Sequence, residues 1–172
     1  RPFTLPIFSL LNLLNILAIQ YNMPVIVSTH PRTENRLKKL NDVKIDERVQ
    51  YLKPFGFFDY NKLQKNALCV VSDSGTISEE ASILNFPAVT IRNSMERPEA
   101  MDAGVIILTG LSNDVILSSI DLAINSKVSP NNIPFEYRVD NVSDRVVRLI
   151  MGLTKLVHRW DGIQYNDLSK ES

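Results

Sequence analysis

The sequence predicts an α/β fold in which helices cover both faces of a parallel β-sheet. Short apolar runs rich in β-branched residues alternate with amphipathic stretches, at the spacing of repeated strand–helix units. The connecting segments are short and contain Pro or Gly. A chain of 172 residues is long enough for one domain with its own hydrophobic core. Alternation, connection length and chain length therefore all favour this fold class.

The expected elements follow one another in a regular order. Strands are predicted at 24–28, 49–52, 68–71, 87–91 and 105–108, and helices at about 10–20, 33–40, 77–84, 113–124 and from 143 onward. An aromatic loop at 54–60 is expected to lead into a further helix that ends at Asn66. Residues 1–9 are expected to form an atypical N-terminal segment, 10–160 the domain, and 161–172 a flexible tail.

Two helices have apolar faces that the spacing picks out. In the first helix the face is expected to consist of Leu10, Leu13, Leu14 and Leu17. In the last helix the residues expected to face inwards are Val146, Val147, Ile150 and Leu153. The first helix is apolar enough to resemble a membrane anchor, but polar residues interrupt it and no small-residue cleavage site follows it. It is therefore interpreted as a helix of a protein without a membrane segment.

Charge and cysteine content exclude several functional classes. The formal net charge is zero and the isoelectric point is near 6.9, so no nucleic-acid partner is expected. The single cysteine, Cys69, lies in a predicted strand, where it is expected to be a small buried side chain. No disulfide can form within the chain, which fits a cytoplasmic location. His30 and His158 are far apart and have no cysteine nearby, so no metal site is predicted.

A polar turn after the third predicted strand is the candidate ligand site. The start of a helix carries unpaired N–H groups and a partial positive charge, and it therefore attracts anions such as phosphate. Gly75 allows close approach to the backbone, and Ser74 and Thr76 can cap the helix or donate hydroxyls to phosphate. Glu79 and Glu80 would repel a phosphate unless one points away, and Glu80 is well placed to accept hydrogen bonds from a sugar diol.

This turn has a simpler interpretation. The alternative is that Ser74 is only a helix cap and that both glutamates only favour the helix dipole. The residues taken alone do not decide between a cap and a nucleotide-sugar site.

Loops after two other strands carry basic side chains at the same predicted edge of the sheet. His30 and Arg32 follow the first strand, and Arg97 follows the fourth. His30 can donate to a diphosphate, and an arginine can bind one with two donors. The alternatives are a solvent-facing loop histidine and an arginine paired with a local carboxylate.

The aromatic loop offers a surface on which a flat base could stack. Tyr60 is the best candidate there, because its hydroxyl prefers some water and a helix is expected to follow it. Phe57 and Phe58 are equally compatible with an ordinary core.

Several of these segments together resemble a known family. Residues 72–81, then Arg92, residues 96–100 and Gly104, resemble the signature of the non-hydrolysing UDP-N-acetylglucosamine 2-epimerases. Residues 29–33, 52–60 and 141–148 look like the branch that forms UDP-N-acetyl-L-fucosamine for capsule or lipopolysaccharide O-antigen. The resemblance covers about Leu10 to His158.

The resemblance implies a GT-B enzyme of two Rossmann-like domains, usually a homodimer, with a UDP-sugar substrate and neither a cofactor nor a metal. This chain is similar to the second domain. By position, the family's binding residues would be His30 and Arg97 on the diphosphate, Ser74 and Gly75 on phosphate, Glu80 on the ribose and Tyr60 against uracil, with Arg32, Thr76 and Glu79 as further candidates. The implied reaction is C2 epimerisation by elimination and re-addition of UDP.

The sequence departs from the family in two respects. The acidic residues that the family uses for C2 proton transfer belong to the first domain, so no catalytic residue is expected in this chain. Residues 1–6 stand where the family has a strand, and in a Rossmann-like order that strand lies mid-sheet, between two others. We therefore expect exposed strand edges, weak UDP binding and no turnover. The alternatives are a GT-B glycosyltransferase domain, an inactive truncated remnant, and a hydrolysing relative.

Overall fold

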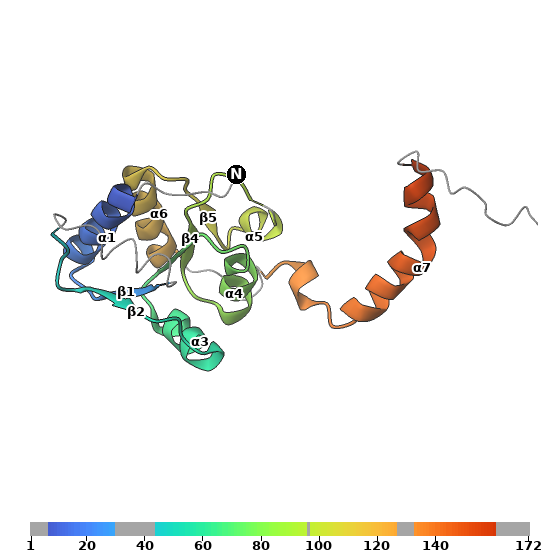
Figure 1. The fold of residues 1–172 in the computed structure, drawn as a ribbon, viewed down its shortest axis with the longest axis horizontal. Coiled ribbons are helices and arrows are strands. Elements are labelled where there is room, and N and C mark those ends of the chain that lie inside the picture. Colours follow the sequence, from blue (N-terminus) through green and yellow to red (C-terminus); the bar gives the residue numbers. More distant parts are fainter. Residues whose placement is uncertain (1–6, 30–43, 96, 127–132, 161–172) are drawn as a thin grey trace, which may run out of the picture. The chain divides into compact units, whose positions relative to one another are not determined.

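The computed structural model describes residues 7–29, 44–95, 97–126 and 133–160. The chain divides into two compact units, residues 1–134 and 135–172 (Figure 1). The first unit contains all the described strands and most of the helices, whereas the second contains a short 3₁₀ helix and one long α-helix. The division falls inside the range 10–160 that the sequence predicts as one domain.

All the strand pairs in the first unit are parallel. β1 (Val25–Ser28) pairs with β2 (Val49–Leu52), and β3 (Val70–Ser72), β4 (Ala88–Thr90) and β5 (Ile107–Leu108) form a second group in that order. The helices of this unit are α1 (Ile7–Tyr21), α3 (Phe57–Asn66), α4 (Ile77–Leu84), α5 (Glu99–Asp102) and α6 (Asn113–Asn125). The predicted parallel α/β architecture is confirmed. The helix predicted at 33–40 lies outside the described residues.

The strands form two hydrogen-bonded groups, whereas the sequence predicts one sheet. In the doubly wound order 3-2-1-4-5-6, the first strand lies between the second and the fourth. The observed groups, β2–β1 and β3–β4–β5, are the two parts that this order leaves when its first strand is removed. Within the described ranges, β1 and β3 each pair on one side only, which agrees with the expectation of exposed strand edges.

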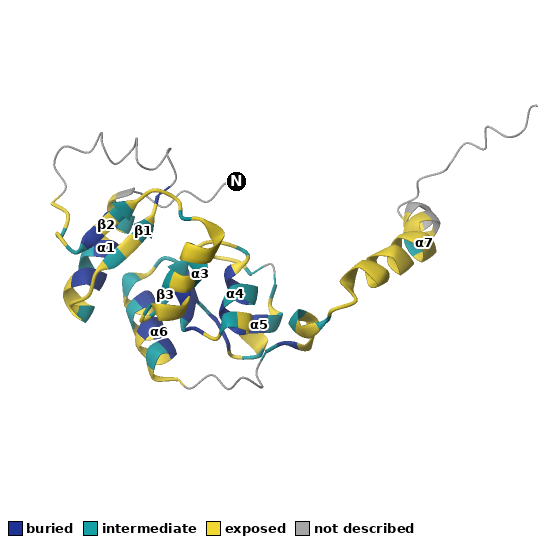
Figure 2. Cartoon of the chain, turned by 90° about the horizontal axis from the view of Figure 1, so that it is seen from below, coloured by how far each residue is buried: buried dark blue, intermediate teal, exposed yellow. Residues whose placement is uncertain are grey.

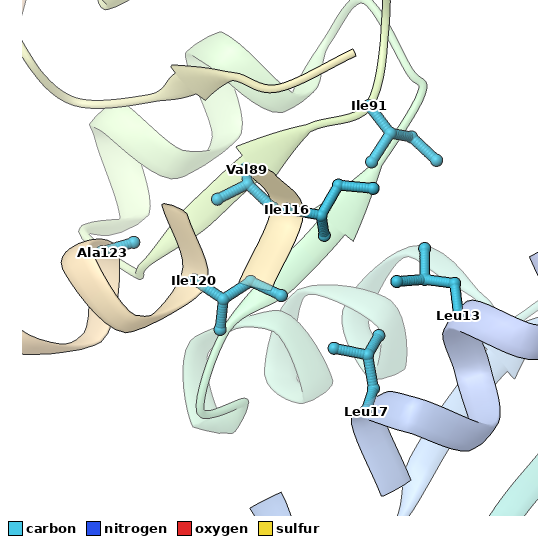
Figure 3. Packing of buried hydrophobic residues seen from close by; sticks show 7 residues of the cluster. All are labelled: Leu13, Leu17, Val89, Ile91, Ile116, Ile120 and Ala123. Carbon is cyan, nitrogen blue, oxygen red and sulfur yellow. The ribbon is translucent and has the colours of Figure 1, made fainter. Parts of the chain in front are cut away.

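Helix α1 contacts residues from both groups of strands. Leu13 and Leu17 pack with Val89 of β4 and with α6, whereas Leu14 packs with Val49 of β2. Figure 3 shows Leu13 and Leu17 directed towards α6 and β4; the cluster drawn there comprises Leu13, Leu17, Val89, Ile91, Ile116, Ile120 and Ala123. The predicted leucine face is confirmed, and α1 begins at Ile7, inside the segment 1–9 that the sequence sets apart.

Helices lie on both sides of β4, as the sequence predicts. α1 and α6 pack on one side of this strand, and α4 and α5 lie on the other (Figure 1). Buried side chains concentrate on the inward faces of these elements (Figure 2). The arrangement places the start of α4 immediately after the carboxyl end of β3, at the edge where open parallel sheets bind ligands.

The aromatic loop is a helix in the structure. α3 begins at Phe57, after the extended Gly56, and the backbone N–H of Tyr60 donates to the Gly56 carbonyl oxygen at 2.9 Å. Phe57 and Phe58 are 76% and 84% exposed and contact each other edge to face. Their interpretation as core is wrong, because the face of α3 that they occupy does not pack on the sheet.

The second unit has a 3₁₀ helix (Phe135–Arg138) and α7 (Val142–Trp160). Val146, Val147 and Ile150 of α7 are 45%, 56% and 58% exposed when this unit is described by itself, and the expectation that they face inwards stays a prediction. The helix is amphipathic, but its apolar face lacks a covering element within the described part of this unit (Figure 2). No helix among the described residues has the length and apolar character needed to span a membrane.

Candidate functional site

Hydroxyl groups fix the turn between β3 and α4. The Ser72 hydroxyl accepts a hydrogen bond from the Ser74 N–H at 3.0 Å, and the Ser74 hydroxyl accepts one from the Thr76 N–H at 3.3 Å. Thr76 occupies the N-cap position, and its hydroxyl donates to Glu80. Because no side chain caps this helix, the first N–H groups of α4 keep the capacity to bind an anion. Ser74 is therefore part of the turn rather than the cap of the helix.

Glu80 accepts hydrogen bonds from two neutral donors. The Thr76 hydroxyl lies 2.8 Å from Glu80 Oε1, and the Gln64 amide nitrogen lies 2.6 Å from Glu80 Oε2. Neither contact neutralises the carboxylate, and a carboxylate has about four lone-pair sites, so it can accept further hydrogen bonds. The half-buried Glu80 is therefore fixed in position and still able to bind hydroxyl groups.

Glu79 makes the opposite kind of contact. Its Oε1 lies 3.0 Å from Nε of Arg97, whose Nη1 donates to the Gly75 carbonyl oxygen at 2.8 Å. The sequence leaves open whether Arg97 binds an anion or a local carboxylate, and in the structure it pairs with the carboxylate of Glu79. This pairing balances the charge of Glu79 beside the turn. A guanidinium has further N–H donors, so Arg97 can also bind an anion at the turn.

Tyr60 lies on the Glu80 side of the turn. Burial is the main cause that raises the pKa of its hydroxyl above the ordinary value, and the carboxylates of Glu80 and Asp73 raise it further, while a hydrogen bond with Gln64 lowers it. Tyr60 therefore stays protonated around neutral pH and can donate or accept a hydrogen bond there.

The structure brings most of the predicted residues together. Those that gather around the start of α4 are Tyr60, Ser74, Gly75, Thr76, Glu79, Glu80 and Arg97. His30 and Arg32 lie outside the described residues, so their predicted roles stay predictions. In the described ranges, no group of His, Cys, Asp and Glu side chains is arranged to hold a metal ion.

Sequence reasoning missed Gln64. It is 3% exposed and is the buried residue of α3, and it contacts Glu80 from a helix 16 residues earlier in the chain. The available signal was its position four residues after Tyr60, which places both side chains on one face of a helix. That signal was hidden because residues 54–60 were interpreted as a loop.

A hollow of about 720 Å³ occurs elsewhere, in the second unit. It is lined mainly by apolar residues of α7, and none of the candidate site residues borders it. The polar groups that could recognise a ligand lie instead at the start of α4, so we place the candidate site there.

Fold and site together define a doubly wound parallel α/β domain with a polar turn at the carboxyl end of a strand. The sequence profile of the family described as UDP-N-acetylglucosamine 2-epimerase matches residues 6–151. The chain belongs to this family, as the resemblance predicts. The match also favours the epimerase over the glycosyltransferase alternative.

Individual relatives agree with the family match. The UDP-N-acetylglucosamine 2-epimerase of Methanocaldococcus jannaschii is 34% identical over 133 residues, which cover 76% of this chain and 36% of that protein. The structure of a Rickettsia bellii UDP-N-acetylglucosamine 2-epimerase has a TM-score of 0.72 and 39% identity, covering 88% of this chain and 42% of the other. The structure of the M. jannaschii enzyme in complex with UDP-GlcNAc and UDP has a TM-score of 0.72 and 29% identity, and the match covers 84% of this chain and 40% of that one. This chain thus spans about 36–42% of the length of these relatives.

Proposed function

We propose that this chain is the UDP-binding half of an enzyme that epimerises a UDP-2-acetamido sugar at C2. Membership of the family supports the reaction class. The length relative to whole relatives supports the assignment to one half of the enzyme. The observation that carries the proposal is the pair of contacts at the start of α4, where Arg97 is held beside Gly75 and Glu80 keeps its charge.

Each part of UDP has a binding group in this proposal. The diphosphate lies over the backbone of Ser74 and Gly75, with Arg97 beside it. The Glu80 carboxylate accepts the ribose hydroxyls, and Tyr60 lies against the uracil ring. His30, outside the described residues, is proposed as a further donor to the diphosphate. Arg32, Thr76 and Glu79 are secondary: in the structure Thr76 contacts Glu80, and Glu79 contacts Arg97.

The proposed reaction begins with removal of the C2 proton of the sugar by a base. The electron pair of the broken C–H bond forms a double bond between C1 and C2, and the bond between C1 and the diphosphate oxygen breaks, so that UDP leaves with the electron pair of that C–O bond. Re-addition of UDP to C1 and protonation of C2 on the opposite face complete the inversion. Arg97 and the start of α4 stabilise the negative charge that develops on the leaving diphosphate. The base belongs to the other half of the enzyme.

Finer assignments rest on the resemblance of residues 29–33, 52–60 and 141–148 to one branch of the family. On that basis the product is an activated sugar for capsule or O-antigen synthesis, of the UDP-N-acetyl-L-fucosamine type. A homodimer of the whole enzyme and a cytoplasmic location are proposed on the same basis.

Calorimetric titration of the 172-residue chain with UDP tests the proposal. We expect measurable but weak binding that is reduced in both Glu80→Ala and Arg97→Ala. Asp114→Ala is the matched control, because Asp114 is an exposed acid in the first turn of another helix, α6. Unchanged affinity in both site variants would contradict the site, and epimerisation by the chain alone would contradict the placement of the base elsewhere.

A further inference from the structure

Helix α3 buries a polar residue and exposes two of its three aromatic ones. Gln64 is 3% exposed, whereas Phe57 and Phe58 in the first turn are mostly exposed. Burial of a primary amide is unfavourable unless its polar atoms find partners. Gln64 therefore needs a specific polar contact where α3 buries it.

That contact is made with Glu80. Gln64 Nε2 lies 2.6 Å from Glu80 Oε2, whereas Gln64 Oε1 is buried without a hydrogen-bond partner among the described residues. Only the NH₂ group of the amide can donate to a carboxylate, and the reversed amide would place two acceptors against each other. The chemistry of the pair therefore determines which way the Gln64 amide points.

The contact restrains the carboxylate without balancing its charge. Thr76 donates to Glu80 Oε1 and Gln64 donates to Glu80 Oε2, so each oxygen has one neutral donor. Each oxygen then keeps about one lone pair for a further hydrogen bond. Two free lone pairs on one fixed carboxylate match the two adjacent hydroxyls of a ribose. A lysine or arginine in place of Gln64 would instead compete with the ligand for the charge.

We propose that Gln64 is a positioning residue that orients the Glu80 carboxylate towards the ribose diol of the nucleotide. This inference rests on the proposed function, because it needs Glu80 to be the ribose acceptor. Gln64 acts through Glu80 and does not itself touch the nucleotide. Gln64 also forms a hydrogen bond with Tyr60, so its positioning role is measured by the part of the affinity that depends on the ribose hydroxyls.

Comparison of UDP with 2′-deoxy-UDP isolates that part of the affinity. The unmodified chain is expected to bind UDP about tenfold more tightly than 2′-deoxy-UDP, because the deoxynucleotide leaves a charged acceptor without its hydroxyl. Gln64→Met, which keeps the length of the side chain and removes the donor, is expected to reduce this ratio to about twofold, because the affinity for UDP falls more than the affinity for 2′-deoxy-UDP. Lys65→Met, at an exposed neighbouring position of α3, is the matched control and keeps the full ratio.

The outcomes separate the inference from the proposed function. If Gln64→Met keeps the tenfold ratio while Glu80→Ala loses it, the positioning role is wrong and the ribose role of Glu80 stands. If Gln64→Met lowers the affinities for UDP and 2′-deoxy-UDP by the same factor, Gln64 has a merely structural role and the inference is overturned. If the unmodified chain does not bind UDP or does not distinguish the two nucleotides, the proposed ribose site fails and the inference fails with it. Should Gln64→Met not fold, Gln64→Asn, which withdraws the amide from Glu80 by one methylene group, takes its place.

Discussion

The two sides of the first turn of α4 carry the same side chain in opposite electrostatic settings. Glu79 faces the segment before α5 and pairs with the cation of Arg97, whereas Glu80 faces α3 and, among the described residues, accepts from the neutral donors Thr76 and Gln64. Consecutive helix positions point about 100° apart, so neighbouring residues reach different elements. This difference explains how two adjacent carboxylates are compatible with an anion site at the start of α4. One carboxylate holds the cation in place and the other stays free to accept hydroxyls.

The largest effect is expected on the Arg97 side. Arg97→Ala removes a charge-assisted contact to the diphosphate, which is worth about 1.5–3 kcal/mol, so UDP affinity is expected to fall by about tenfold or more. Uridine, which lacks phosphate, is expected to bind this variant and the unmodified chain equally well. Calorimetry with both ligands measures the two effects.

Arg148→Ala is the control for that experiment. Arg148 pairs with Asp144 on the exposed surface of α7, in the other unit, and its loss is expected to leave UDP affinity unchanged. A uridine affinity that falls as far as the UDP affinity in Arg97→Ala would place Arg97 away from the diphosphate.

A somewhat smaller effect is expected on the other side. Glu80→Ala removes the ribose acceptor, so the affinities for UDP and for uridine should both fall by a similar factor of about ten. The parallel loss distinguishes this variant from Arg97→Ala, and competition binding with the two ligands measures it. If Glu80→Ala lowers the affinity for UDP but not the affinity for uridine, Glu80 acts on the phosphates, and the contrast drawn between Glu79 and Glu80 is wrong.

Neutralising the carboxylate that holds Arg97 is expected to change affinity only a few-fold. Glu79→Gln keeps an oxygen that can accept from the Arg97 guanidinium and removes the competing negative charge, so UDP should bind about two- to threefold more tightly at low salt. The gain is expected to disappear at high salt, where exposed charges are screened. Titrations at two ionic strengths test this, and weaker binding at low salt would show that the Glu79 charge is needed to place Arg97.

The smallest change concerns the titration of Tyr60. Glu80 is one of the groups that raise the pKa of this phenol, so Glu80→Ala should move that pKa towards the ordinary value near 10. The shift has no consequence below about pH 9, because Tyr60 is protonated there in both proteins. Glu79→Ala should leave the pKa unchanged. The ring-carbon NMR signals of Tyr60 followed against pH report it, and an equal shift in both variants would contradict the separation of the two sides.

The sequence predicts most of the elements because their patterns are local. The strand runs are short and β-branched, and the leucine spacing of α1 shows directly which face is buried, with Leu13 and Leu17 in the core. The polar turn and its neighbours were likewise predictable from one contiguous motif. Where the chain's own local preferences decide the structure, the prediction holds.

The remaining features depend on contacts between segments distant in sequence. The described strands form two hydrogen-bonded groups, and no local pattern within β1 or β3 reveals which strands pair. Gln64 is buried because of Glu80, 16 residues further along the chain. Periodicity shows that one face of α7 is apolar but does not identify the element that would cover it.

The most direct test of the central claim is a backbone NMR titration of the 172-residue chain with UDP. The account predicts that the largest shifts occur at the amides of residues 74–80 and at Arg97, and that the double variant Glu80→Ala, Arg97→Ala abolishes them. Shifts that fall mainly on α7, or an unchanged spectrum at millimolar UDP, would contradict a nucleotide site at the start of α4.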